Sequence, residues 1–421
     1  MEVRYEKVYR SCCGIDVHKK LIVACFLQKS NKSEVREFGA TTSELLKLSD
    51  WLTEGGCEMV AMESTGSYWK PVYNIFESAG LKCMIVNASH MKNVPGRKTD
   101  ILDAEWIADL LKHGLLEASF IPDRQQRELR ELGGYRSSLI GEKTRELNRI
   151  QKVLEGANIK ISGTIKNING KSGRCLLDAI ADGRKLTIED LEQMKNEHQI
   201  ARNLKATNEQ LAEDLNGVIN ENQVNLLKEM LKHIDELDDH IATVSGLIDK
   251  LMTEEQLLAA DKITQVTGIG HTSAQAIISV IGSDMSRFPT DASISKWAGL
   301  CPGNNESAKK RGSGRTQKGN KLLKTTLTVC ANSAVKNKDS YFYAQFKRIS
   351  AHRGKKRAII AVAHSMLIAI YHMLKDNVDF VDLGSDYYNR FNKEKKINAY
   401  IKKLQALGAV VELKPTTTQI A

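Results

Sequence analysis

The stretch CCGIDVHKKLIVACFL, residues 12–27, decides the fold of the N-terminal part of the chain. Its two apolar runs, Cys12–Val17 and Leu21–Leu27, are joined by a short polar link, which predicts two neighbouring strands. A third strand is expected at Glu34–Phe38. Helices and strands then alternate, with helices expected at Ser43–Leu52, Tyr68–Ser78 and about Asp100–His113 and strands at Glu58–Met62 and Leu81–Val86. This order predicts an α/β domain with a mixed sheet flanked by helices over residues 1–122.

The rest of the chain is predicted to be mainly α-helical. A helical linker is expected over residues 123–258, with a loop at 159–173, followed by an α-rich domain over 259–375 and a polar tail over 376–421. Apolar residues in the linker recur at a spacing of three and four, which is the pattern of a coiled coil. The pattern leaves open whether the helix pairs within the chain, pairs between chains, or packs on its own domain. The residues are Leu227, Met230, Ile234, Leu237, Ile241, Val244, Ile248 and Leu251.

The composition limits the class of protein. The chain has 421 residues, enough for two or three domains, and a formal net charge of +10, which makes a polyanionic partner plausible. Its eight cysteines form no CxxC pair, so a zinc site has little support. The N-terminus lacks the apolar core of a signal peptide, and no run of about 18 apolar residues predicts a membrane span. A cytoplasmic protein is therefore expected.

Four carboxylates stand at the ends of predicted elements. Asp16 and Glu63 end predicted strands, and Asp100 and Asp103 are spaced so that they share one helix face. If the four converge, their mutual repulsion requires a cation, and Mg²⁺ prefers such oxygen ligands. For each residue alone, a simpler reading is a turn or a helix cap, with Asp100 as the N-cap and Asp103 favouring the helix dipole.

The segments around these acids resemble a known family. GIDVHKK, MESTGSYWKPV and RKTDILDAEWIADLL are similar to the RuvC-like DEDD domain of the insertion-sequence family 110 transposases. The resemblance implies an RNase H-like fold in which Asp16, Glu63, Asp100 and Asp103 chelate Mg²⁺. It also places Lys98 in the matching motif, where it would touch phosphate, although a lone lysine is usually only solvated.

Positive charge is concentrated in the C-terminal half. Residues 306–357 hold fifteen Lys or Arg residues and two acids, which gives this segment more positive charge than the net +10 of the whole chain. Such focused charge suits binding to a phosphate backbone, while a solvated charged surface is the simpler alternative. Just upstream, the Gly268-Ile269-Gly270 turn between predicted helices resembles a helix-hairpin-helix hook that holds phosphate through backbone N–H groups. The same turn may serve only to cap a helix.

The basic segment also resembles the C-terminal transposase domain of the same family. The similar elements are Arg287-Phe288, the turn WAGLCPG at 297–303, a serine in a polar loop, and KGNKLLKTTL at 318–327. By motif position, the resemblance implies that Ser307 is the nucleophile that attacks DNA phosphate. The family usually has Ser-Gly here, whereas this chain has Ser307-Ala308, so Ser313, which precedes Gly314, is the second candidate. The expected nucleic-acid contacts of this segment are Lys309, Lys310, Arg311, Arg315, Lys318 and Lys321.

These features predict a Mg²⁺-dependent DNA transposase. The resemblance further implies a structured guide ("bridge") RNA and assembly as a homodimer or homotetramer. One alternative is a nuclease of the Holliday-junction type, which needs the carboxylates but no serine. Another is a nucleic-acid-binding protein without catalytic activity, for which neither the carboxylates nor a metal would matter.

Overall fold

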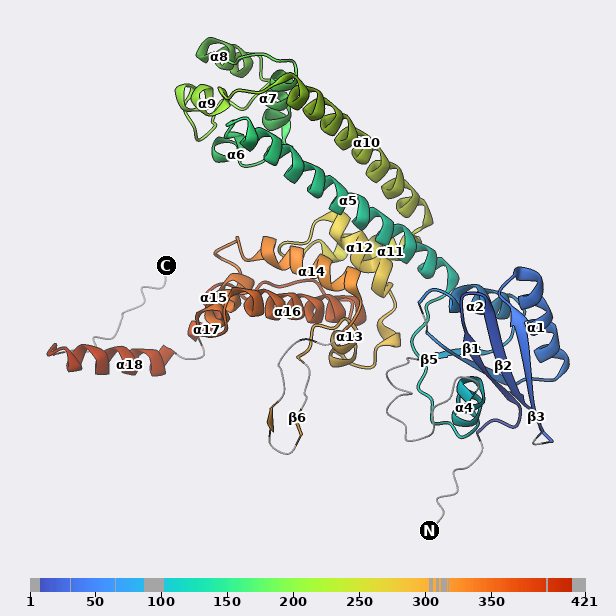
Figure 1. Ribbon diagram of the computed structural model, residues 1–421. Coiled ribbons are helices and arrows are strands. Elements are labelled where there is room, and N and C mark those ends of the chain that lie inside the picture. The colour runs from blue at the N-terminus through green and yellow to red at the C-terminus, as the bar shows by residue number, and fades with distance from the viewer. Residues whose placement is uncertain are drawn as a thin grey trace. The chain divides into compact units, whose positions relative to one another are not determined.

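The chain folds into two compact units, Met1–Asp123 and Arg124–Ala421, in a computed structural model (Figure 1). The structure describes residues 8–30, 32–64, 66–86, 102–302, 306–307, 310–311, 316, 318–390 and 393–410. Each unit has its own hydrophobic core.

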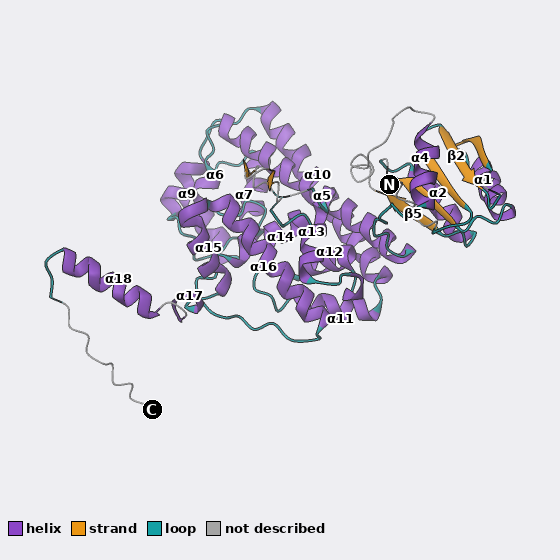
Figure 2. Ribbon diagram, turned by 90° about the horizontal axis from the view of Figure 1, so that it is seen from below, coloured by secondary structure: helices purple, strands orange, loops and turns teal. Residues whose placement is uncertain are grey.

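The first unit is built on a five-stranded mixed sheet, drawn in orange in Figure 2. The strand order is β3-β2-β1-β4-β5, with β1–β2 and β2–β3 antiparallel and β1–β4 and β4–β5 parallel. The mixed α/β sheet predicted from the sequence is confirmed. The elements are β1 (Cys12–Val17), β2 (Leu21–Leu27), β3 (Ser33–Gly39), α1 (Thr42–Glu54), β4 (Met59–Glu63), α2 (Trp69–Ser78), β5 (Cys83–Val86) and α4 (Leu102–Lys112).

Helices cover both faces of this sheet because β1 and β4 are apolar on both sides. Cys13, Ile15 and Val17 point into a core shared with α1 and α2. Cys12 and Ala61 belong to a second cluster formed with the apolar side chains of α4. A strand buried on both faces reads as a continuous apolar run, as β1 does.

The second unit begins with a long helical arm. In Figure 1, α5 (Arg124–Gly156) and α10 (Glu221–Leu251) lie side by side. They are antiparallel, since Gln125 near the start of α5 bonds the carbonyl of Leu251 at the end of α10, at 2.7 Å. The predicted coiled-coil seam therefore packs within the chain, against α5, and Leu227, Ile234, Leu237, Val244 and Ile248 are buried in it.

Four short helices with their own core lie at the far end of the arm. The prediction of a loop at residues 159–173 is wrong in part. It contains a short helix, and a second one begins at Lys171, because Ile161, Ile165 and Ile168 are buried in this core. The helices are α6 (Ile161–Thr164), α7 (Lys171–Ala181), α8 (Ile188–Asn196) and α9 (Asn208–Leu215).

Helix α16 (Lys355–Lys375) packs against several helices in the rest of the second unit. This helix is long and apolar enough to span a membrane by length and composition alone, but half of its apolar window is buried and it packs on α13, α14 and α15 as a core helix. The other elements are α11 (Glu254–Ile263), α12 (His271–Ile281), η1 (Met285–Arg287), α13 (Asp291–Trp297), β6 (Glu306–Ser307), β7 (Lys310–Arg311), α14 (Lys321–Ala334), α15 (Tyr341–Arg353), α17 (Tyr387–Arg390) and α18 (Lys393–Ala406).

The segment expected as a polar tail, 376–421, is partly packed. Asp382 accepts hydrogen bonds from the backbone N–H of Tyr341 at 2.7 Å and from the hydroxyl of Thr267 at 3.3 Å. The ring of Phe380 stacks on Phe342 at 5.9 Å between centroids. The first residues of this segment therefore belong to the folded second unit.

Candidate functional site

Two of the predicted acids lie at the carboxyl ends of neighbouring parallel strands. Ile15 of β1 pairs with Met62 of β4, so Asp16 and Glu63 occupy the next position on each strand. Paired strands lie about 4.8 Å apart, and side chains alternate between the two faces of a sheet. Asp16 and Glu63 are therefore neighbours on the face that α4 covers.

A glycine brings the third acid to the same place. A Cβ on Gly14 would lie 2.3 Å from both the carbonyl oxygen of Ala104 and the amide nitrogen of Ala108, so α4 touches β1 through backbone atoms. The thiol of Cys12 also reaches the carbonyl of Ala108, at 3.7 Å. Asp103 stands in the first turn of α4, directly before Ala104, and is half-buried beside the strand ends.

The carboxyl group of Asp16 is in an unfavourable environment for its negative charge. Its residue is only 8% exposed, and burial is the main cause that raises its pKa above the usual range. The negative charge of Asp103 raises this pKa further. Opposing them, His18 lowers the pKa by its charge and by a 2.8 Å contact between its Nε2 and Oδ2 of Asp16.

His18 is a site residue that the sequence analysis missed. Its ring is mostly exposed and stands two residues after Asp16, beyond the end of β1. The sequence pattern does not distinguish His18 from the two lysines that follow it, so only its contact with Asp16 in the structure identifies it.

The remaining parts of the predicted carboxylate site lie outside the described residues. These are Asp100 and Lys98. Among the residues that the structure does describe, no three His, Cys, Asp or Glu side chains form a ready metal cage. Asp16 and Glu63 at the strand ends and Asp103 in the first turn of α4 therefore do not form a closed ligand set among the described residues.

The predicted hairpin of the second unit joins α11 to α12, and its two glycines have different roles. Gly268 has a φ of +93°, and a Cβ there would lie 2.6 Å from the backbone of Ala334 and of Cys330 in α14. Gly270 is the N-cap of α12, is exposed, and has open space where a Cβ would be. Gly268 therefore packs the turn onto α14, and Gly270 presents the free N-terminal end of α12.

Helix α12 is held along its length by polar side chains of α5. Arg136, which is 2% exposed, donates to Oε1 of Gln275 at 2.8 Å and to the carbonyl of Thr272 at 3.1 Å. Near the other end of α12, Nε of Arg130 donates to the carbonyl of Val280 at 3.0 Å. These bonds satisfy buried polar groups and fix the hairpin to the arm.

The serine predicted as the nucleophile lies on a short strand. Ser307 of β6 pairs in antiparallel register with Lys310 of β7, and Glu306 pairs with Arg311. Lys309, Ser313 and Arg315 lie outside the described residues. The structure thus places the backbone of Ser307 beside that of Lys310, in a segment that the sequence indicated as a loop.

The two ends of this serine-bearing segment are in contact. Pro302 and Thr316 form an isolated antiparallel bridge. A Cβ on Gly319 would lie 2.3 Å from the amide nitrogen of Gly299, so the KGN motif packs directly on the WAG turn. The exposed Lys318 stands directly before this contact, and Lys321 is the first residue of α14.

Comparison with protein families assigns both units. A model of the IS110 transposase DEDD domain matches residues 13–159, and a model described as a transposase of the IS116/IS110/IS902 family matches residues 260–347. No curated protein matches the chain. The mixed sheet with helices on both faces fits the RNase H-like, RuvC-like fold that the sequence predicted. Because the two models together match more than half of the sequence, the chain belongs to the IS110 family of transposases.

Proposed function

We propose that this transposase cuts and rejoins DNA with a Mg²⁺-binding carboxylate site and a serine nucleophile. The proposal is supported by Asp16 and Glu63 at the ends of the paired strands β1 and β4, and by Asp103 in the helix that packs on β1. Asp100, three residues before Asp103 in the matched DEDD domain, is the proposed fourth ligand.

The residues present fit a divalent cation. The ligands are carboxylate oxygens, which Mg²⁺ prefers, and burial together with Asp103 already makes the ionised form of Asp16 costly. A bound cation would supply the positive charge that neutralises these acids and polarises a DNA phosphate. The chain's own contribution is rigidity, since Asp16, Glu63 and Asp103 stand on elements fixed by backbone contact. His18 would hold one oxygen of Asp16 in place.

In the proposed covalent step, Oγ of Ser307 bonds to a DNA phosphorus as its proton passes to a base. The bridging P–O bond breaks, and the leaving oxygen takes a proton from that protonated base and departs as a DNA hydroxyl. A second DNA hydroxyl then attacks the phosphoserine and releases the serine. Lys309, Lys310 and Arg311 would stabilise negative charge on the attacked phosphate. Ser313 is the second candidate nucleophile.

The proposed partners are DNA and a structured guide RNA. The excess of positive charge over residues 306–357, including Arg315, Lys318 and Lys321, supports binding to a phosphate backbone. The exposed Gly270 end of α12 supports a further phosphate contact, and Lys98 is a candidate contact near the carboxylates. We place the protein in the cytoplasm, as a homodimer or homotetramer.

The test of the mechanism is a covalent protein–DNA adduct. The full chain is purified with its copurifying RNA, which is sequenced, and incubated with DNA and Mg²⁺. Adducts are then separated on a denaturing gel. Ser307→Ala is expected to abolish the adduct while Ser313→Ala, the matched control, retains it, and Asp16→Asn is expected to reduce cleavage at least a hundredfold.

The other outcomes separate the rival functions. If Ser307→Ala and Ser313→Ala both cleave DNA normally, the protein is a nuclease of the Holliday-junction type without a serine intermediate. If Asp16→Asn and removal of Mg²⁺ leave all activity unchanged, the carboxylate site is not catalytic. If no RNA copurifies and recombination proceeds without it, guidance by RNA is wrong.

A further inference from the structure

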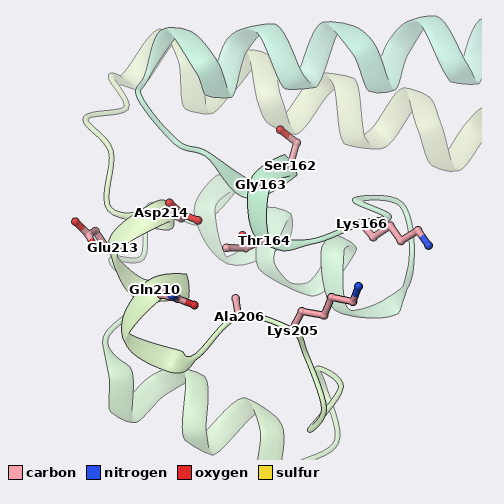
Figure 3. A pocket seen from close by; sticks show the side chains of 9 residues that line it. All are labelled: Ser162, Gly163, Thr164, Lys166, Lys205, Ala206, Gln210, Glu213 and Asp214. Carbon is pink, nitrogen blue, oxygen red and sulfur yellow. The ribbon is translucent and has the colours of Figure 1, made fainter. Parts of the chain in front are cut away.

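The short helices at the far end of the arm border an open polar cavity (Figure 3). Its volume is about 590 Å³, which is within the range of about 300–1,000 Å³ that is typical of sites for small ligands. Residues of and next to α6 form one wall, and α9 with the residues before it forms the other. The polar lining includes Ser162, Thr164, Lys166, Lys205, Gln210 and Asp214.

Charge is separated across this cavity. Lys166 and Lys205 extend on one side in Figure 3, and two acids of α9, Glu213 and Asp214, lie on the other. No ion pair within 4.0 Å joins either lysine to an acid in residues 102–302, all of which the structure describes. Opposite charges thus line one cavity without neutralising each other.

Several other cations at this end of the arm are paired, whereas Lys171 and Lys185 outside the cavity are exposed. Lys160 contacts Glu155, and Arg174 forms ion pairs with Asp178, at 2.8 Å, and with Asp235. Lys195 donates to Oδ1 of Asn208 at 2.5 Å. Lys166 and Lys205 have no such acidic partner and line the cavity together, so they are available to an anion bound there.

The charged and polar side chains that line the cavity indicate which class of ligand fits it. Two ammonium groups on one side suit a phosphate, and a carboxylate with nearby hydroxyl and amide groups suits the hydroxyls of a sugar, as in sites where an acid binds ribose. Inorganic phosphate alone would leave Asp214 facing a second negative charge. No aromatic side chain lines the cavity, so it offers no surface on which a base would stack.

We propose that this cavity binds the ribose-phosphate unit of a ribonucleotide, with phosphate at Lys166 and Lys205 and ribose hydroxyls at Asp214. The base points out of the open cavity and contributes little. The ligand is either a free ribonucleotide or one nucleotide of an RNA strand. The site lies in the arm, and the proposal does not depend on the carboxylate mechanism.

The test uses isothermal titration of the full chain with AMP, UMP and dAMP. AMP and UMP are expected to bind within about threefold of each other, because the base is not held. AMP is expected to bind roughly tenfold more tightly than dAMP, the effect of one hydrogen bond to a charged group. Asp214→Asn is expected to reduce this preference to near one, and Lys166→Gln with Lys205→Gln to weaken AMP at least tenfold.

The control is Lys185→Gln, which changes an exposed lysine at the same end of the arm but outside the cavity. It is expected to leave AMP binding unchanged, and circular dichroism checks that each variant is folded. A single-stranded oligoribonucleotide that displaces AMP identifies an RNA strand as the source of the ligand. A failure to displace AMP identifies a free nucleotide, and both outcomes support the site. The proposal is overturned if AMP does not saturate, if dAMP binds equally well, or if Lys185→Gln weakens AMP as much as the cavity variants.

Discussion

Both units of this transposase place a proposed site where a glycine lets two distant elements touch through their backbones. In the first unit, the missing side chain of Gly14 lets α4 pack directly on β1. In the second unit, the missing side chain of Gly268 lets the hairpin pack directly on α14. The contacts differ in what they carry. Gly14 lies between acidic side chains, with Asp16 on its own strand and Asp103 beside its partner Ala104. The hairpin presents only the backbone of Gly270 at the N-terminus of α12.

The two contacts therefore relate packing stability to the proposed function differently. Beside Gly14, packing and chemistry are coupled, because any shift of α4 moves Asp103 relative to Asp16. In the hairpin they are divided between two residues, since Gly268 makes the packing contact and Gly270 faces open space. Substitutions at these positions therefore test whether each proposed site depends on its packing.

The largest effect is expected for Gly14→Val. The new side chain would overlap backbone atoms of Ala104 and Ala108, and neither can move unless α4 moves. We expect a loss of about 3 kcal/mol or more in the free energy of unfolding, and loss of Tb³⁺ binding as a probe of the carboxylate site. Urea denaturation and Tb³⁺ luminescence measure the two effects.

The matched control for this prediction is Gly134→Ala. Gly134 lies inside α5 with open space around it, so alanine is expected to stabilise the helix by about 0.5–1 kcal/mol. If Gly14→Val keeps both its stability and its Tb³⁺ binding, then α4 does not hold Asp103 against the sheet in the way described.

The hairpin is expected to respond less, and unequally. Gly268→Ala combines a left-handed backbone with an overlap onto α14, and we expect it to cost about 2 kcal/mol. Gly270→Ala has room and an ordinary φ of −94°, so only the weaker N-cap preference of alanine applies, at under about 1 kcal/mol. Thermal unfolding of both variants gives the comparison. Equal losses would contradict the division of roles between the two glycines.

Local patterns predicted much of the first unit. The bounds of β1 and β2 agree with the apolar runs because a polar link marks where each strand stops. Strand β5 begins at Cys83 rather than Leu81, since the backbone N–H of Leu81 bonds the carbonyl of Phe76 and closes the end of α2 instead. The partner of the coiled-coil seam stayed undecided, because a heptad pattern specifies a face and not the helix that covers it.

The geometry of the candidate sites needed the structure. Strand ends and helix spacing indicated Asp16, Glu63 and Asp103 as candidates, but the contact of Gly14 with Ala104 joins residues far apart in the chain and leaves no periodic signal. The same holds for Arg136, a charged residue in a helix that turned out to be buried on α12. The carboxylate role of Asp100 and the nucleophilic role of Ser307 remain predictions.

A small gain in stability is expected for Asp16→Asn without divalent cations. The pKa of Asp16 is raised by burial and by Asp103, so the folded state binds its proton more tightly than the unfolded state does. The ionised carboxylate therefore destabilises the fold above the raised pKa and has no such effect below its ordinary pKa of 3.8. Asparagine removes this charge, and we expect a gain in the free energy of unfolding at pH 7 that vanishes in acid.

The effect of Mg²⁺ on the unfolding temperature completes the test of Asp16→Asn. Mg²⁺ bound only to the folded state adds stability that grows with its concentration, so it should raise the unfolding temperature of the unchanged chain and not that of Asp16→Asn. Asp50→Asn, which alters an exposed acid on α1, is the control and should follow the unchanged chain under all conditions. If Asp16→Asn is less stable than the unchanged chain at pH 7 without metal, then its neighbours already stabilise the carboxylate. The electrostatic reason for a cation at this edge of the sheet would then be lost.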